Sequence, residues 1–122
     1  MNDDIIMPKT GKVIANFKSK SAAFENEFIL SYPGSKLIFK GTDSQVGKSF
    51  DVGTFNAGQR LIFAIKIPDG NTYYTLHAWN KDACDHVIKV RTGATKWELR
   101  WEDLYGLGDK DYNDDVVEIE IK

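Results

Sequence analysis

Residues 95–121 read TKWELRWEDLYGLGDKDYNDDVVEIEI, and an alternating apolar pattern stands at each end of this stretch. In Thr95–Trp101 large apolar side chains take every second position, and charged side chains fill the positions between them. The same period returns in Val117–Ile121. A period of two is typical of a strand with one buried face. The stretch therefore predicts two β-strands joined by the segment between them.

The segment from Trp101 to Asp115 is strongly acidic, with six carboxylates, one amide side chain and a single lysine. Carboxylates crowded this closely repel one another, which raises their pKa values and costs folding free energy. Ca²⁺ removes this penalty because it takes six to eight oxygen ligands at about 2.3–2.6 Å and tolerates irregular loops. The segment therefore predicts a calcium loop. The expected side-chain ligands are Asp109, Asp111, Asn113 and Asp114, completed by Glu102 or Asp103.

Oxygen-bearing side chains alternate from Asp109 to Asn113, as at the start of an EF-hand loop. Two differences argue against an EF-hand. The sixth position, which must be glycine for the sharp turn, is Asp114, and a strand pattern follows instead of a helix. Mg²⁺ fits less well than Ca²⁺ because it demands octahedral geometry and keeps more water. A solvated acidic loop without a cation is the alternative.

The terminal motif, WEDLYGLGDKDYND followed by an apolar strand, resembles the signature of a bacterial calcium-binding β-sandwich domain of unknown function. Domains of this kind occur in exported, surface and RTX-type adhesin proteins. The resemblance extends to Phe55–Phe63, to Asn80–Asp82 and to Asp85–Val87, and it covers the chain from about residue 50 to residue 122. It implies a calcium-binding sandwich in an extracellular setting. One departure is Asp115, which stands where the family usually has an apolar residue.

The rest of the chain consists of short alternating or apolar runs separated by turn residues. About nine strands with almost no helix predict a single all-β domain over residues 1–122, an antiparallel β-sandwich with jelly-roll-like or Greek-key connections. A closed barrel is the alternative. Arg60–Ile67 is apolar on most of both faces, which predicts a central strand. Residues 1–10 are expected to form a loose lead-in, and Lys18–Asn26 is the one helical candidate.

A second group of oxygen-bearing side chains, Asn80, Asp82 and Asp85, falls between two expected strands. Loops of a sandwich gather at its two ends, so this group could meet the acidic segment as a second metal or ligand site. An ordinary polar loop with Asx-turns explains it equally well. Trp79 and Tyr74 lie close by in the sequence, and they are the expected aromatic platform for a ligand.

Composition and motifs exclude several classes of function. The 122 residues carry a formal net charge of −2, and no basic stripe indicates nucleic-acid binding. No apolar run reaches the roughly eighteen residues of a membrane span. Gly47-Lys48-Ser49 lacks the first glycine of a phosphate-binding loop and precedes a strand pattern. Cys84 is the one cysteine, and no nucleophile or triad spacing predicts an enzyme.

These observations lead to an expected function. The chain is expected to be a calcium-dependent, non-catalytic binding module with carbohydrate as its ligand, in the manner of a lectin. The alternative is a structural or adhesin-type module that binds a surface protein, in which calcium only stabilises the fold. The resemblance favours an extracellular or cell-surface location. The acidic N-terminus lacks the pattern of a secretory signal, so a cytoplasmic location stays open.

Overall fold

The computed structural model describes residues 5–20, 26–68, 70, 72–75, 87–101 and 115–122. These residues form ten β-strands and one short 3₁₀ helix. In chain order the elements are β1 (Ile5–Ile6), β2 (Gly11–Lys20), β3 (Glu27–Tyr32), β4 (Lys36–Lys40), η1 (Asp43–Gln45), β5 (Ser49–Phe55), β6 (Arg60–Lys66), β7 (Thr72–Tyr74), β8 (Val87–Gly93), β9 (Lys96–Trp101) and β10 (Asp115–Ile121). Within these ranges, no helix has the length and apolar character required to cross a membrane.

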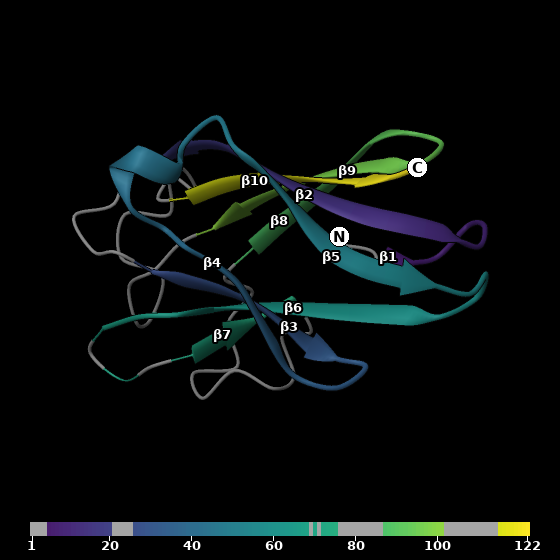
Figure 1. Ribbon diagram of the computed structural model, residues 1–122, viewed down its shortest axis with the longest axis horizontal. Coiled ribbons are helices and arrows are strands. Elements are labelled where there is room, and N and C mark those ends of the chain that lie inside the picture. Colours follow the sequence, from purple (N-terminus) through teal and green to yellow (C-terminus); the bar gives the residue numbers. More distant parts are fainter. Residues whose placement is uncertain (1–4, 21–25, 69, 71, 76–86, 102–114) are drawn as a thin grey trace.

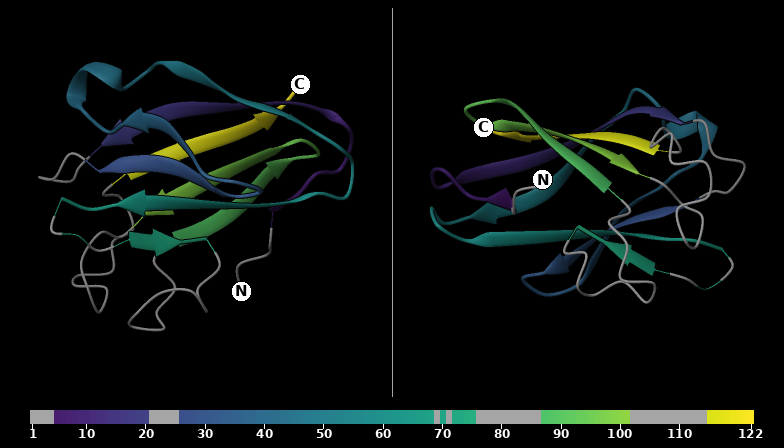
Figure 2. Two further views of the ribbon diagram at one scale, coloured as in Figure 1. Left: turned by 60° about the horizontal axis from the view of Figure 1, so that its bottom comes forward. Right: turned by 180° about the vertical axis from the view of Figure 1, so that it is seen from behind.

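The strands form two antiparallel sheets of five strands each. The first sheet has the order β1-β6-β3-β4, with β7 also paired to β6. The second sheet has the order β5-β2-β10-β9-β8. The two sheets lie face to face as two layers (Figure 1; Figure 2). The predicted all-β sandwich is confirmed, and the strands form two sheets instead of the alternative closed barrel.

The core lies between the sheets, and it contains the side chains that the alternating sequence pattern predicts to be buried. Trp97 and Leu99 of β9 pair with Ile119 and Val117 of β10, and all four side chains are buried. On the opposite sheet, Phe28 of β3 is buried at the centre of an aromatic cluster. Its ring lies 5.2 Å from Phe39, 5.3 Å from Phe63 and 6.4 Å from Trp101, measured between ring centroids. Phe28 therefore joins the two layers.

Two lysine side chains bridge the open sides of the sandwich. On one side, Lys36 of β4 donates from Nζ to the carbonyl oxygen of Val52 in β5, at 3.2 Å. On the other side, Lys89 of β8 donates from Nζ to the carbonyl oxygen of Thr75, just after β7, at 2.8 Å. Each ammonium thus connects an edge strand of one sheet to the other sheet, and charged donors make stronger hydrogen bonds than neutral ones.

Two expectations about the first half of the chain are wrong in part. Ile5–Ile6 is strand β1, paired with Arg60 and Leu61 of β6, so the lead-in is not loose at this point. Met7, which follows, is buried. A two-residue strand is too short to show a period, which explains why the sequence pattern misses it. The expected helix at Lys18–Asn26 fails at its start, because Lys18–Lys20 continue β2 alongside β10; residues 21–25 lie outside the described ranges.

The expectation of a central strand in Arg60–Ile67 is confirmed. Strand β6 pairs with β3 along one edge and with β1 and β7 along the other. Its interior residues are buried on both faces, including Ile62 and Ala64, which point away from the core that Leu61, Phe63 and Ile65 enter. A strand with neighbours on both edges and cover on both faces has little polar surface to present, in keeping with its continuous apolar run.

Candidate functional site

The acidic segment is held at both ends by a pair of neighbouring strands. Trp101, the last residue of β9, pairs directly with Asp115, the first residue of β10. The same row continues to Lys20 at the end of β2 and to Val87 at the start of β8. Residues 102–114 therefore leave and re-enter the second sheet at adjacent positions.

The predicted ligands themselves lie outside the described ranges. This applies to Glu102, Asp103, Asp109, Asp111, Asn113 and Asp114 of the calcium loop, to Asn80, Asp82 and Asp85 of the second group, and to Trp79. Within the described ranges, no three His, Cys, Asp or Glu side chains come together as a metal site. The calcium site therefore stays a prediction, and the structure bears on it through the residues that anchor the segment.

The second group is anchored next to the first. Its segment, residues 76–86, begins after Thr75 and ends at Val87, which pairs with Trp101. The Thr75 carbonyl oxygen accepts the hydrogen bond from Lys89 described above, and the Thr75 amide donates to the carbonyl oxygen of Phe63 at 2.8 Å. The segment of the second group thus ends in β8, next to the strand β9 from which the acidic segment begins. This agrees with the expectation that loops of a sandwich gather at its ends.

A buried polar pair lies beside the strand ends that anchor the acidic segment. Asn26 donates from Nδ2 to Oδ2 of Asp115 at 2.8 Å, and both residues are almost fully buried, with 1% and 3% of their surface exposed. The bond ties the residue just before β3, in the first sheet, to the first residue of β10, in the second. The hydrogen bond fixes the position of the Asp115 carboxylate. Asp115 directly follows Asp114, one of the predicted calcium ligands.

Sequence reasoning had missed the role of this pair. The sequence pattern places Asn26 at the end of the helical candidate, and it marks Asp115 only as one of the six crowded carboxylates and as a departure from an apolar position. The signal was present in the alternation itself, because Asp115 shares its period with Val117, Ile119 and Ile121 and all four are buried. An acidic residue at an inward-facing strand position predicts a buried partner. The identity of that partner, distant in sequence, could not be read from the pattern.

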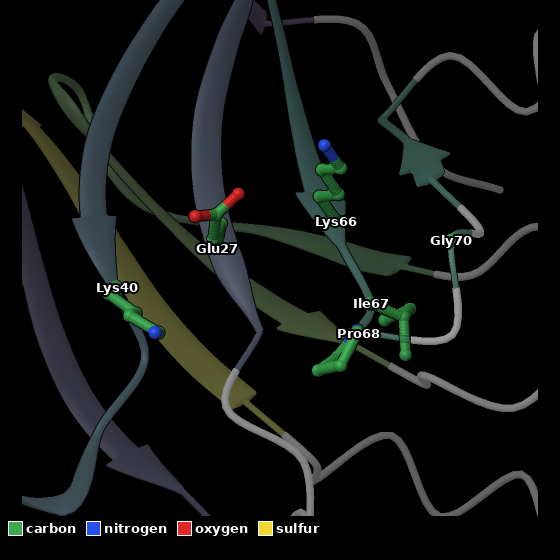
Figure 3. A pocket seen from close by; sticks show the side chains of 6 residues that line it. All are labelled: Glu27, Lys40, Lys66, Ile67, Pro68 and Gly70. Carbon is green, nitrogen blue, oxygen red and sulfur yellow. The ribbon is translucent and has the colours of Figure 1, made fainter.

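A charged cavity of about 240 Å³ borders this end on the outside of the first sheet (Figure 3). Glu27 of β3 lies between Lys40 of β4 and Lys66 of β6, because the three residues pair in one row across the strands. Ile67 and Pro68 form the adjoining wall. Two ammonium groups beside one carboxylate leave a net positive charge, so this cavity suits hydroxyl or anionic groups and not a cation.

Tyr74 is the one predicted platform residue within the described ranges. It lies in β7 opposite Ala64 of β6. Its neighbour Tyr73 is fully buried in the core, so Tyr74 projects from the outer face of the first sheet and is half-buried there. The position of Tyr74 on the outer face is compatible with the predicted platform.

The outer face of the second sheet carries a polar network across β5, β2, β10 and β9. Ser49 donates to the Asn16 side-chain oxygen, and Asn16 donates from Nδ2 to Glu118 at 2.9 Å. Glu98 stands directly opposite Glu118 on the neighbouring strand and bonds to Arg100. Two carboxylates opposite each other are destabilising when unpaired. The amide of Asn16 and the guanidinium of Arg100 offset that repulsion.

At the far end of this face, Glu120 lies 3.3 Å from the Lys122 ammonium and 3.5 Å from the Lys96 ammonium. Burial by itself raises the pKa of Glu120, but the hydrogen bonds and charges of Lys122 and Lys96 outweigh it and hold the pKa below the ordinary glutamate value. A depressed carboxyl pKa contributes stability above the unfolded-state pKa, and this contribution is lost as pH falls through the folded-state pKa.

We therefore expect Glu120→Gln to lower the free energy of unfolding at neutral pH and to have little effect once the carboxyl is protonated. The loss should not exceed about 1 kcal/mol, because both lysine side chains are roughly half exposed and solvent weakens such pairs. Urea unfolding of both proteins at neutral pH and near pH 3 measures the difference. Curves separated by the same amount at both pH values would contradict this assignment.

Comparison with known proteins gives one match. A family model described as a domain of unknown function, DUF4114, matches residues 34–122. No curated protein and no solved structure matches the chain. The matched range includes the whole acidic segment and both strands that anchor it, and it begins further upstream than the resemblance noted in the sequence. The family match carries no assigned activity, metal or ligand.

Proposed function

The chain belongs to the DUF4114 family, and on that premise we propose that it is a calcium-dependent, non-catalytic binding module for carbohydrate. The observation that supports calcium most directly is the pairing of Trp101 with Asp115. It closes a segment that contains five carboxylates and one amide side chain between neighbouring strands. Such crowding is unfavourable without a counterion, and Ca²⁺ is the ion that best fits many oxygen ligands on an irregular loop.

Carbohydrate is the proposed ligand because of the surface beside this segment. Tyr74 presents a ring on the outer face of the first sheet, and Trp79 follows a few residues later in the chain. The neighbouring cavity contains Glu27, Lys40 and Lys66, whose polar groups suit hydroxyl recognition. Aromatic rings with polar groups around them match the two kinds of surface of a sugar, its C–H face and its hydroxyl rim.

The second candidate function is a structural or adhesin-type module that contacts a surface protein. The buried bond between Asn26 and Asp115 favours it, because this bond joins the two sheets next to the predicted calcium loop. A cation there would then stabilise the sandwich without touching a ligand. Both functions fit an extracellular or cell-surface location, where calcium is abundant enough for modules with Kd values of about 10⁻⁴–10⁻³ M.

Two measurements on one preparation test the proposal. Calcium titration of EGTA-treated protein by calorimetry, with metal analysis before and after the treatment, measures the ion. An array of immobilised oligosaccharides, probed in CaCl₂ and in EGTA, measures the ligand. The proposal expects calcium binding together with glycan binding that weakens in EGTA. Calcium binding without any glycan signal would favour the structural module, and metal-free protein that does not bind calcium would exclude both forms.

A further inference from the structure

A larger cavity lies at the end of the sandwich opposite the acidic segment. Its volume is about 460 Å³, within the range of about 300–1,000 Å³ for small-molecule sites. The described residues that line it are Tyr32, Gly58, Gln59, Arg60 and Ile62. In Figure 1 the connection from β5 to β6, which contributes Gly58 and Gln59, lies at the right, whereas β10 begins at the left.

The strand register gives this cavity an aromatic wall. Tyr32, the last residue of β3, pairs with Ile62 of β6 on the outer face of the first sheet. Tyr32 is 45% exposed, while its cross-strand partner Ile62 is buried. Ile6 of β1 pairs with Arg60 on the same face and is also exposed, so it extends the apolar surface beside the cavity.

The polar wall is held in place by backbone hydrogen bonds. Met7 accepts a bond from the Gly58 amide at 2.8 Å and donates its own amide to the Gln59 carbonyl oxygen at 2.9 Å. The Ala57 amide donates to the Thr10 hydroxyl oxygen at 3.0 Å. The turn between β5 and β6 is therefore fixed from outside by the chain after β1. A fixed wall lowers the ordering cost of binding, since little has to be immobilised when a ligand arrives.

The functional groups of the cavity are complementary to a pyranose ring. The Tyr32 ring offers an apolar face with a hydroxyl at its edge. Gln59 donates from Nε2 to the Arg60 carbonyl oxygen at 2.9 Å, which orients its amide, and that amide also carries the acceptor Oε1. The Arg60 guanidinium is a planar set of N–H donors suited to adjacent oxygens. Ile62 supplies an apolar floor.

We infer that this cavity is a glycan subsite, in which one hexopyranose unit stacks on Tyr32 and its hydroxyl groups bond to Gln59 and Arg60. The inference takes its class of ligand, carbohydrate, from the proposed function. It does not depend on the proposed calcium ion. Arg60 begins β6 and Lys66 ends it, and Lys66 lies at the end near Asn26 and Asp115. The subsite is thus separated from the predicted calcium loop by the length of the sheet.

Tyr32→Ala is the decisive variant. With the oligosaccharide that gives the strongest array signal, Tyr32→Ala should weaken the affinity about tenfold or more, as expected when an aromatic anchor is removed. Gln59→Ala should also weaken it, because a hydroxyl partner is lost. The matched control is Leu37→Ala, which removes an exposed apolar side chain from β4 on the same outer face and outside the cavity. Its affinity should equal that of the unchanged protein.

The outcomes separate this inference from the proposed function. Loss of glycan binding in Tyr32→Ala, with the thermal response to calcium unchanged, supports the subsite. Glycan binding that Tyr74→Ala abolishes and Tyr32→Ala leaves intact overturns the subsite while the proposed function stands. Tyr32-dependent glycan binding by protein that does not bind calcium supports the subsite and overturns the calcium dependence. An array with no signal overturns the subsite.

Discussion

Excess CaCl₂ is expected to raise the midpoint of thermal unfolding well above the value in excess EGTA. An ion that binds only the folded chain stabilises it by about 2.7 kcal/mol at one hundred times its Kd. For a domain of this size, that free energy corresponds to a rise of about 10 °C. The physical reason is the relief of repulsion in residues 102–114, whose ends are fixed by the Trp101–Asp115 pair. Calorimetry or circular dichroism on the same sample measures the shift.

A substitution within the segment makes this expectation specific. Asp111→Ala removes one proposed ligand, so it should lower the unfolding midpoint in CaCl₂ and change it little in EGTA. Asp51→Ala is the matched control, because Asp51 is an exposed carboxylate of β5 whose one described ion pair is with Lys12 at 3.4 Å. That variant should respond to calcium like the unchanged protein. Equal losses by Asp111→Ala in both buffers would contradict a role for Asp111 as a ligand.

The strands were predictable from the sequence where their faces differ in polarity. Strands β9 and β10 alternate strictly, and the predicted inward residues Trp97, Leu99 and Trp101 are buried. Strand β6 was predictable as central for the opposite reason, because it is apolar on both faces. In each case the polarity of a side chain matches the face of the strand on which it lies. The order of apolar and polar residues within one strand is therefore enough to predict which faces are buried.

The features that the sequence did not reveal depend on contacts between distant positions. Strand β1 is defined only by its pairing with β6, and two residues show no period. The bond from Asn26 to Asp115 joins residues 89 positions apart. The cavity beside Tyr32 exists because β3 ends where β6 begins. Register between distant strands determines the first and the third, and the packing of one sheet on the other determines the second. Alternation within one strand specifies neither.

The candidate site was likewise predictable in its chemistry but not in its position in the fold. Residue types in 102–114 were sufficient to predict an ion, because the chemistry of calcium ligands is local and compositional. The position of that segment in the fold required the pairing of β8, β9, β10 and β2, which brings Val87, Trp101, Asp115 and Lys20 into one row. The sequence thus predicts the chemistry, and the sheet shows where the strands that flank the segment end and begin.

Phe28→Ala is expected to be the most destabilising substitution outside the acidic segment. Phe28 is fully buried, and its ring packs against Phe39 and Phe63 of its own sheet and against Trp101 of the other. Removing a buried aromatic ring costs about 3–5 kcal/mol, because transfer free energy is lost and a cavity remains. This is a large part of the total stability of about 5–15 kcal/mol for a typical domain.

Urea unfolding measures the loss as a lower midpoint with an unchanged slope. Phe28→Leu should fall between the two proteins and serves as the measurable variant if Phe28→Ala does not fold. Val90→Ala is the control, because Val90 is an exposed apolar residue of β8 and its removal should change stability by no more than about 0.5 kcal/mol. Similar losses for Phe28→Ala and Val90→Ala would mean that the layers are not joined through Phe28. Trp101 also ends the strand that precedes the acidic segment, so Phe28 supports the strand end from which that segment leaves the second sheet.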